Sequence, residues 1–163
     1  NFDMVASPNP ARMIYDGNGS RFGDAGPSGS GEIEAIFSEW FDAQGLVTQE
    51  TAFDGRSDYG PFIWTGIPAG GLFTGAEQPK TSAEQDAYGG TAGEAYDACY
   101  HQGCDTIENL DLDVLDEMAG AAAHATMGLA FYDGVLGGKS RSILRLPDWL
   151  PSSCAAHERT WRR

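Results

Sequence analysis

The sequence predicts a single α/β domain built from packed layers of helices and strands. A chain of 163 residues fits one domain with one core, because folding at this size buries roughly 70% of the surface that the unfolded chain exposes. Amphipathic helical segments near the start and the end of the chain enclose an apolar run that is typical of a buried strand. This order of helix, strand and helix is typical of layered α/β domains.

Two short strands are expected at the start of the chain. Residues 1–7 alternate like the end of a strand, and two prolines end regular structure directly after it. Asp3 is therefore expected near a strand end, where ligand groups collect in α/β sheets. Residues 13–15 are a second strand candidate, and residues 16–31, rich in Gly, Ser and Asp, are typical of a flexible loop.

Residues 32–44 and 111–132 predict two amphipathic helices. The apolar side chains that share one face of the first helix are Ile33, Ile36, Phe37, Trp40 and Phe41. Those that form a stripe on the second helix are Leu115, Met118, Ala122, Ala125 and Leu129. His124 lies about half a turn from Leu115 at roughly 100° per residue, so we expect a surface or packing histidine that points away from the stripe.

Between these helices, the segment 66–75 predicts a buried strand that runs into a Gly-rich loop. Its Gly pairs do not match a phosphate-binding loop, which needs a Lys in a fixed position. The segment 53–62, which precedes it, combines Gly, Asp and aromatic residues.

Charge divides the chain into an acidic body and a basic tail. Residues 1–138 carry 22 acidic and 4 basic side chains, whereas residues 139–163 carry 2 acidic and 6 basic ones. The acidic body repels phosphate backbones, which argues against a nucleic-acid function. It keeps the protein in solution or helps to collect cations and cationic peptide amines. The tail has no regular apolar pattern and is expected to be irregular.

The start of the chain and its apolar runs bear on targeting and membrane insertion. No targeting segment precedes Asn1, so we expect a processed product or a fragment. No apolar run approaches the roughly 18 to 20 residues that cross a bilayer, so no membrane function is expected.

The segment 99–105 places a histidine, a tyrosine and an acid beside two cysteines. In an oxidising compartment Cys99 and Cys104 form a six-residue ring, worth about 2 kcal/mol through loop closure. In the cytosol they are thiols or metal ligands. The spacing is wider than in most zinc ribbons and no second pair exists, so the disulfide is favoured. A closed ring would fix the direction of His101.

Asp3 and His101 are the candidate metal ligands. Carboxylate oxygen and imidazole nitrogen are ligands that catalytic zinc uses, with three protein ligands and an open position for water. Two ligands are too few for such a site, and an ordinary strand-end Asp and a hydrogen-bonded His remain alternatives.

Several ordered motifs together resemble the C-terminal half of the secreted dizinc aminopeptidases of the Streptomyces type, in metallopeptidase family 28. The resemblance covers about residues 1–133 and is carried by NFDM at 1–4, SPNP at 7–10, DGRSD at 54–58, GIP at 66–68, GGLFTG at 70–75, GGTAG at 89–93 and CYH at 99–101. It implies a mostly parallel mixed sheet flanked by helices, here as a partial domain.

The resemblance also implies roles for individual residues. Asp3 ligates one zinc and His101 the other, while the Tyr100 phenol hydrogen-bonds the oxyanion of the tetrahedral intermediate. Asp3 and the Arg56 carbonyl help to hold the free amino group of the peptide. Met4 and Phe73, with Tyr100, line a pocket for a large apolar side chain, although both would be core residues in most folds.

Other parts of the family's site are missing from this sequence. The remaining zinc ligands and the general-base Glu lie upstream of the Asp3 motif in the family, so the chain alone is expected to bind metal weakly and to be inactive. Asp116 corresponds to one calcium ligand of some members, but Gly120 stands where a second acid is expected. Calcium is therefore doubtful.

The expected function is part of a secreted zinc aminopeptidase acting on peptides that begin with a large apolar residue. One alternative is a glutaminyl-peptide cyclotransferase, which has a related fold and one zinc. The other is a non-catalytic binding domain of the same fold. An upstream His-x-Asp and Glu-Glu pair would favour the peptidase.

Overall fold

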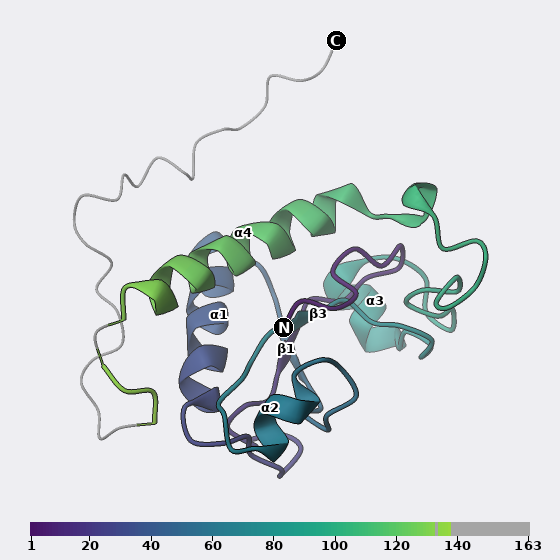
Figure 1. Ribbon diagram of the computed structural model, residues 1–163. Helices are drawn as coiled ribbons and strands as arrows, with labels where there is room; N and C mark the ends of the chain where they lie inside the picture. Colours follow the sequence, from purple (N-terminus) through teal and green to yellow (C-terminus); the bar gives the residue numbers. More distant parts are fainter. Residues whose placement is uncertain (133, 138–163) are drawn as a thin grey trace.

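A small mixed sheet, covered on one face by two helices, forms the centre of the computed structural model (Figure 1). The structure describes residues 1–132 and 134–137, so the predicted basic tail lies outside the described residues. Its elements in chain order are β1 (Met13–Tyr15), α1 (Ser30–Gln44), β2 (Gln49–Thr51), α2 (Gly60–Trp64), β3 (Leu72–Phe73), α3 (Ser82–Tyr88), the 3-10 turn η1 (Ile107–Asn109) and α4 (Leu112–Ala130).

The sheet has the strand order β2-β1-β3. β1 pairs in parallel with β2 and antiparallel with β3, so the predicted α/β fold with a mixed sheet is confirmed. On the other side of β3, Phe2 forms an isolated parallel bridge with Leu72. The strand expected over residues 1–7 is thus reduced to this one bridge.

The two faces of β1 serve different purposes, because successive side chains of a strand point to opposite sides. Ile14, together with Leu72 of β3, packs against α1 and α4 in the main core. Met13 and Tyr15 belong to separate apolar clusters on the other face, with Phe73 at the edge of both. The sheet face that carries Met13 and Tyr15 is therefore the one that α1 and α4 do not cover.

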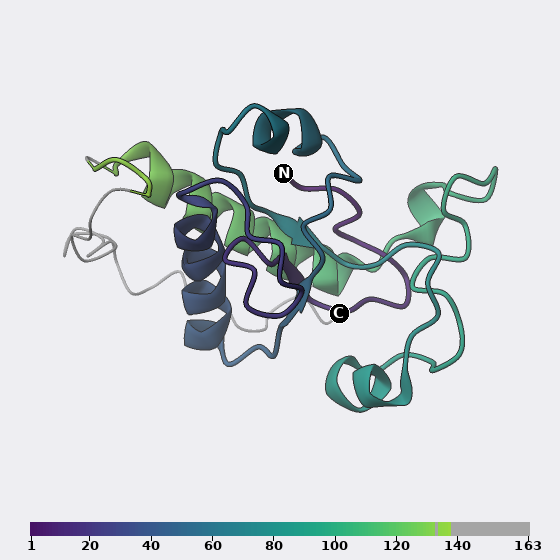
Figure 2. The ribbon, with the colours of Figure 1, turned by 90° about the horizontal axis from the view of Figure 1, so that it is seen from below.

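Helix α1 confirms the predicted apolar face, and α4 corrects the predicted stripe. The buried side of α4 is made of Val114, Met118, Ala121, Ala125 and Gly128, a stripe rotated from the expected one. Helix α1 lies against α4 (Figure 2), and its Phe37 and Phe41 belong to the same core cluster as the small residues of this stripe. Gly120 illustrates the fit, since a Cβ there would meet the Trp40 indole at 2.8 Å. His124 is half-buried rather than turned fully outward, and burial lowers its pKa.

Side-chain caps fix two helix starts. Asp111 accepts hydrogen bonds from the amides of Asp113 and Val114, so the predicted helix over 111–132 begins after Asp111 as its cap. Thr81 and Glu84 form a capping box at the start of α3. None of the described helices is long and apolar enough to cross a membrane.

The loop after β1 is more ordered than its composition predicts. Asp16 is fully buried, and its carboxylate accepts hydrogen bonds from the amides of Ser20, Arg21 and Phe22. The expectation of a flexible loop over residues 16–31 is therefore wrong for its first part, because one buried acid organises it.

Candidate active site

A cavity of about 410 Å³ opens on the sheet face away from α1 and α4. Five residues that the sequence singled out line it together: Asp3, Met4, Arg56, Phe73 and Tyr100. They come from four segments spread along the chain, so the fold and not local sequence brings them together.

Asp3 lies exposed at the cavity with one of its carboxylate oxygens already engaged. Ser57 donates its hydroxyl proton to Asp3 Oδ2 at 2.6 Å, and the Asn1 side-chain amide donates to the Ser57 oxygen at 3.1 Å. Such a donor behind a carboxylate fixes its orientation, as outer hydrogen bonds do for metal ligands. The sequence motif contains Ser57, but nothing in the residue spacing indicated this contact.

Met4 adopts a left-handed backbone conformation with φ of 58°, which is uncommon for a residue other than glycine. Its carbonyl oxygen accepts hydrogen bonds from the amide of Thr74 at 2.7 Å and from the Thr74 hydroxyl. Within residues 1–132 and 134–137, His101 is the only other non-glycine residue with positive φ, at 57°. Both unusual conformations occur at the candidate site, where such strain is concentrated in functional proteins.

The predicted disulfide between Cys99 and Cys104 is confirmed. The ring that it closes carries Tyr100 and His101, whose side chains stack with centroids 3.9 Å apart. Tyr100 lines the cavity, whereas the exposed His101 stands beside it and is not among the lining side chains of the described chain. The cavity therefore brings together five of the six predicted site residues, with the sixth next to it.

Arg56 and Glu77, which both line the cavity, form an ion pair. The guanidinium lies 3.2 Å from the Glu77 carboxylate, and this hydrogen bond and charge raise the pKa of Arg56. Both side chains are largely exposed, so the pair contributes little to stability. Its effect is to keep a cation and an anion at the edge of the cavity.

Two aromatic residues that the sequence did not single out also line the cavity. Tyr15 from β1 and Tyr59 before α2 have ring centroids 4.7 Å apart, and both contact Phe53. Burial raises the pKa of Tyr59 to about 12, so its phenol keeps its proton at neutral pH. No local pattern marks these tyrosines, because only the tertiary fold places them at the cavity.

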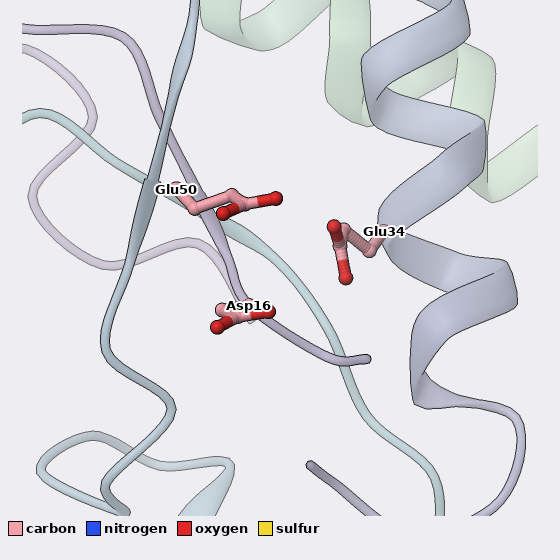
Figure 3. A group of neighbouring side chains, drawn as sticks. All are labelled: Asp16, Glu34 and Glu50. Atoms are coloured by element: carbon pink, nitrogen blue, oxygen red, sulfur yellow. The ribbon is translucent and has the colours of Figure 1, made fainter. Parts of the chain in front are cut away.

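A second group of carboxylates lies at the end of β1, and Figure 3 shows its members Asp16, Glu34 and Glu50. One oxygen atom from each of the three lies within 4.8 Å of the other two, a spacing at which a cation can bridge them. Each already accepts hydrogen bonds from the loop of residues 16–22, such as that from the Asn18 amide to Glu34 at 2.9 Å. Burial, opposed by these bonds, raises the pKa of Glu34.

The donors that the family resemblance assigns to zinc are Asp3, which lines the cavity, and His101, which stands beside it. A carboxylate and an imidazole fit zinc chemistry, but catalytic zinc takes three protein ligands. The residues therefore fit as part of a ligand set. The expected calcium position is less suitable, because Asp116 is exposed on α4 and the Trp40 indole blocks an acid at Gly120.

Comparison with known proteins identifies relatives of this chain. The sequence pattern of peptidase family M28 matches residues 1–126. Leucine aminopeptidase 2 of Arthroderma otae is 51% identical over 126 residues, covering 77% of this chain and 26% of that protein. An aminopeptidase of Pseudomonas aeruginosa is 50% identical over 130 residues, covering 80% and 24%. The chain thus spans about a quarter of the length of these relatives.

Among solved structures, the zinc aminopeptidase BSAP from Bacillus subtilis resembles the fold with a TM-score of 0.53. The sequences are 19% identical, and the match covers 80% of this chain and 27% of that chain. It supports the architecture, a mixed sheet with flanking helices. The family pattern, which matches residues 1–126, shows that the chain belongs to peptidase family M28.

Proposed function

We propose that the chain is the C-terminal part of the catalytic domain of a secreted zinc aminopeptidase that prefers peptides with a large apolar first residue. The observation that carries the proposal is the cavity, where Asp3, Met4, Arg56, Phe73 and Tyr100 meet. The high identity to proteins named aminopeptidases and the disulfide, which needs an oxidising compartment, support it.

Each side chain has a distinct part in this proposal. Asp3 and the Arg56 carbonyl hold the free amino group of the peptide, while Met4 and Phe73 form an apolar wall for its first side chain. The Tyr100 phenol donates a hydrogen bond to the oxygen on which negative charge develops. Asp3 and His101, with ligands from outside this chain, would hold the zinc, which when bound would act as a Lewis acid and activate a water.

The chain by itself is proposed to be inactive. The family resemblance assigns only Asp3 and His101 of this chain to zinc and assigns the general base to a segment outside it, so we expect weak metal binding. The complete site is proposed to need more of the same domain, and this chain covers only 26% and 24% of the two relatives.

The experiment compares this chain with a version extended upstream by its own reading frame. Leucyl p-nitroanilide turnover and zinc content are measured for both, and for His101→Ala in the extended protein. We expect turnover and two zinc ions per chain only in the extended protein, with turnover lost in His101→Ala. His124→Ala, on α4 away from the cavity, is the matched control and should retain turnover. Turnover that survives His101→Ala would refute the proposal.

A further inference from the structure

Asp97 is a buried acid next to the disulfide ring that has no part in the proposed chemistry. Asp97 is only 4% exposed. Oδ1 accepts hydrogen bonds from the Cys99 amide at 2.8 Å and from the Asn109 side chain at 2.9 Å. Neither ion pair of the described chain involves it, so neutral donors alone hold this carboxylate.

The backbone of Asp97 ties the same residue to the cavity wall. Its amide donates to the carbonyl of Ala76 at 2.8 Å, and Ala76 lines the cavity. Its carbonyl accepts a hydrogen bond from the Tyr100 amide at 3.4 Å. Asp97 therefore connects three parts: the cavity wall, the disulfide ring and, through Asn109, the turn η1.

The disulfide cannot by itself orient Tyr100. It closes residues 99–104 on themselves, and the bond from the Gln102 amide to the Cys99 carbonyl at 2.7 Å also stays within this ring. Apart from bonds to the next two residues, the hydrogen bonds that leave the ring in the described structure end on Asp97. A ring that is rigid inside but held at one residue takes its direction from that residue.

We infer that Asp97 is a positioning residue that fixes the disulfide ring against the cavity, so that Tyr100 faces it and His101 stands beside it. The inference depends on the proposed function only for the purpose of this positioning, because the left-handed backbone of His101 serves that function only if the ring has one orientation. The attachment of the ring at Asp97 itself follows from the described contacts alone.

Amide hydrogen exchange in the 163-residue chain tests this inference. In Asp97→Ala the backbone carbonyl that accepts from the Tyr100 amide remains, but the carboxylate that accepts from the Cys99 amide and the Asn109 side chain is lost. We expect the loosened ring to let the Tyr100 amide exchange about tenfold faster, which corresponds to about 1.4 kcal/mol. The Gln102 amide should change by less than about twofold, because the disulfide keeps its turn closed. A general loss of stability would accelerate both amides alike.

Two variants separate the carboxylate's hydrogen bonding from its charge. Asp97→Asn keeps Oδ1 as an acceptor and should restore Tyr100 exchange to within about threefold of the wild type. Asp105→Ala, an exposed acid in the same segment, removes the same charge and should leave both amides unchanged. Equal acceleration of Tyr100 and Gln102, or an Asp97→Asn variant as fast as Asp97→Ala, would overturn the inference.

If Asp97→Ala does not fold, Asn109→Ala decides the matter, because it removes one donor without disturbing the buried acid. We then expect about threefold faster exchange at Tyr100 alone, and unchanged Tyr100 exchange would overturn the inference. None of these measurements needs zinc or a peptide. Missing aminopeptidase turnover in the extended protein would therefore refute the proposed function without affecting the positioning role of Asp97.

Discussion

The imidazole of His101 stacks on the phenol ring of Tyr100, with 3.9 Å between centroids and 21° between planes. The two side chains that the proposed mechanism assigns to the metal and to the oxyanion therefore pack against each other. A displacement of either ring changes the environment of the other, so a single loop governs both.

Replacing Tyr100 by Phe in the extended protein should lower kcat by about 10²–10³ with little change in KM, because the lost hydrogen bond forms only as charge develops on the substrate oxygen. Steady-state kinetics with leucyl p-nitroanilide measure this. Tyr88→Phe is the matched control, since the Tyr88 hydroxyl makes only a long bond of 3.5 Å to Gln49. A raised KM with unchanged kcat would assign Tyr100 to substrate binding instead.

Opening the disulfide by Cys99→Ala with Cys104→Ala should lower the free energy of unfolding by about 2 kcal/mol, the loop-closure entropy of a short ring. Urea unfolding with and without a reducing agent measures it. Reduced wild type should match the double variant. If reduction leaves the unfolding curve in place, the ring does not contribute to stability.

Glu84 should make stability depend on pH in the acid range. Burial opposes its ionisation, but hydrogen bonds from Tyr96, Thr81 and Gln49 outweigh burial and lower the pKa to about 2. A depressed pKa means that ionised Glu84 stabilises the fold above its ordinary pKa of 4.5 and that this contribution is lost as the pH falls toward 2. After allowance for solvent screening, we expect about 1 kcal/mol.

The measurement is the difference in unfolding free energy between wild type and Glu84→Gln at several pH values. This difference should shrink as the pH falls from 4.5 toward 2. Glu94→Gln, at an exposed position, should show a constant difference. A constant difference for Glu84→Gln as well would contradict the hydrogen-bonded carboxylate.

Lys80→Met should destabilise the fold by about 2–4 kcal/mol, because two carbonyl groups lose their donor. Lys80 is 2% exposed, and its ammonium donates to the carbonyls of Pro10 at 2.6 Å and Gly89 at 2.8 Å. Thermal or urea unfolding measures the loss. A change below about 0.5 kcal/mol would show that water replaces the ammonium at both carbonyls.

Periodicity predicted what depends on local sequence. The apolar face of α1 and the short strand β1 were found because their side chains repeat at the spacing of a helix and occur as a compact apolar run. β2 was missed, since Gln49–Thr51 is polar and becomes a strand only by pairing with β1. α3 carried a usable signal in Thr81 and Glu84, the spacing of a capping box.

The candidate site depended on the family resemblance more than on the residues alone. Ordered motifs brought Asp3, Arg56 and Tyr100 into one prediction, and the cavity places them together. Spacing offered no sign of Ser57 behind Asp3 or of Asp97 behind the ring, because hydrogen bonds between distant segments have no local pattern. The stripe on α4 was wrong because neighbouring small residues satisfy several helical faces equally well.

The sheet order has a consequence for how the chain folds. The central strand β1 finds both of its partners much later in the sequence, and α1 must wait for α4 from the far end of the described chain before the core is closed. Loop-closure entropy is therefore spent before apolar contacts compensate for it, which is the topology of a slow folder. We therefore expect a protease cut between β1 and β3, or between α1 and α4, to separate core partners and unfold the whole unit, rather than release an independent piece.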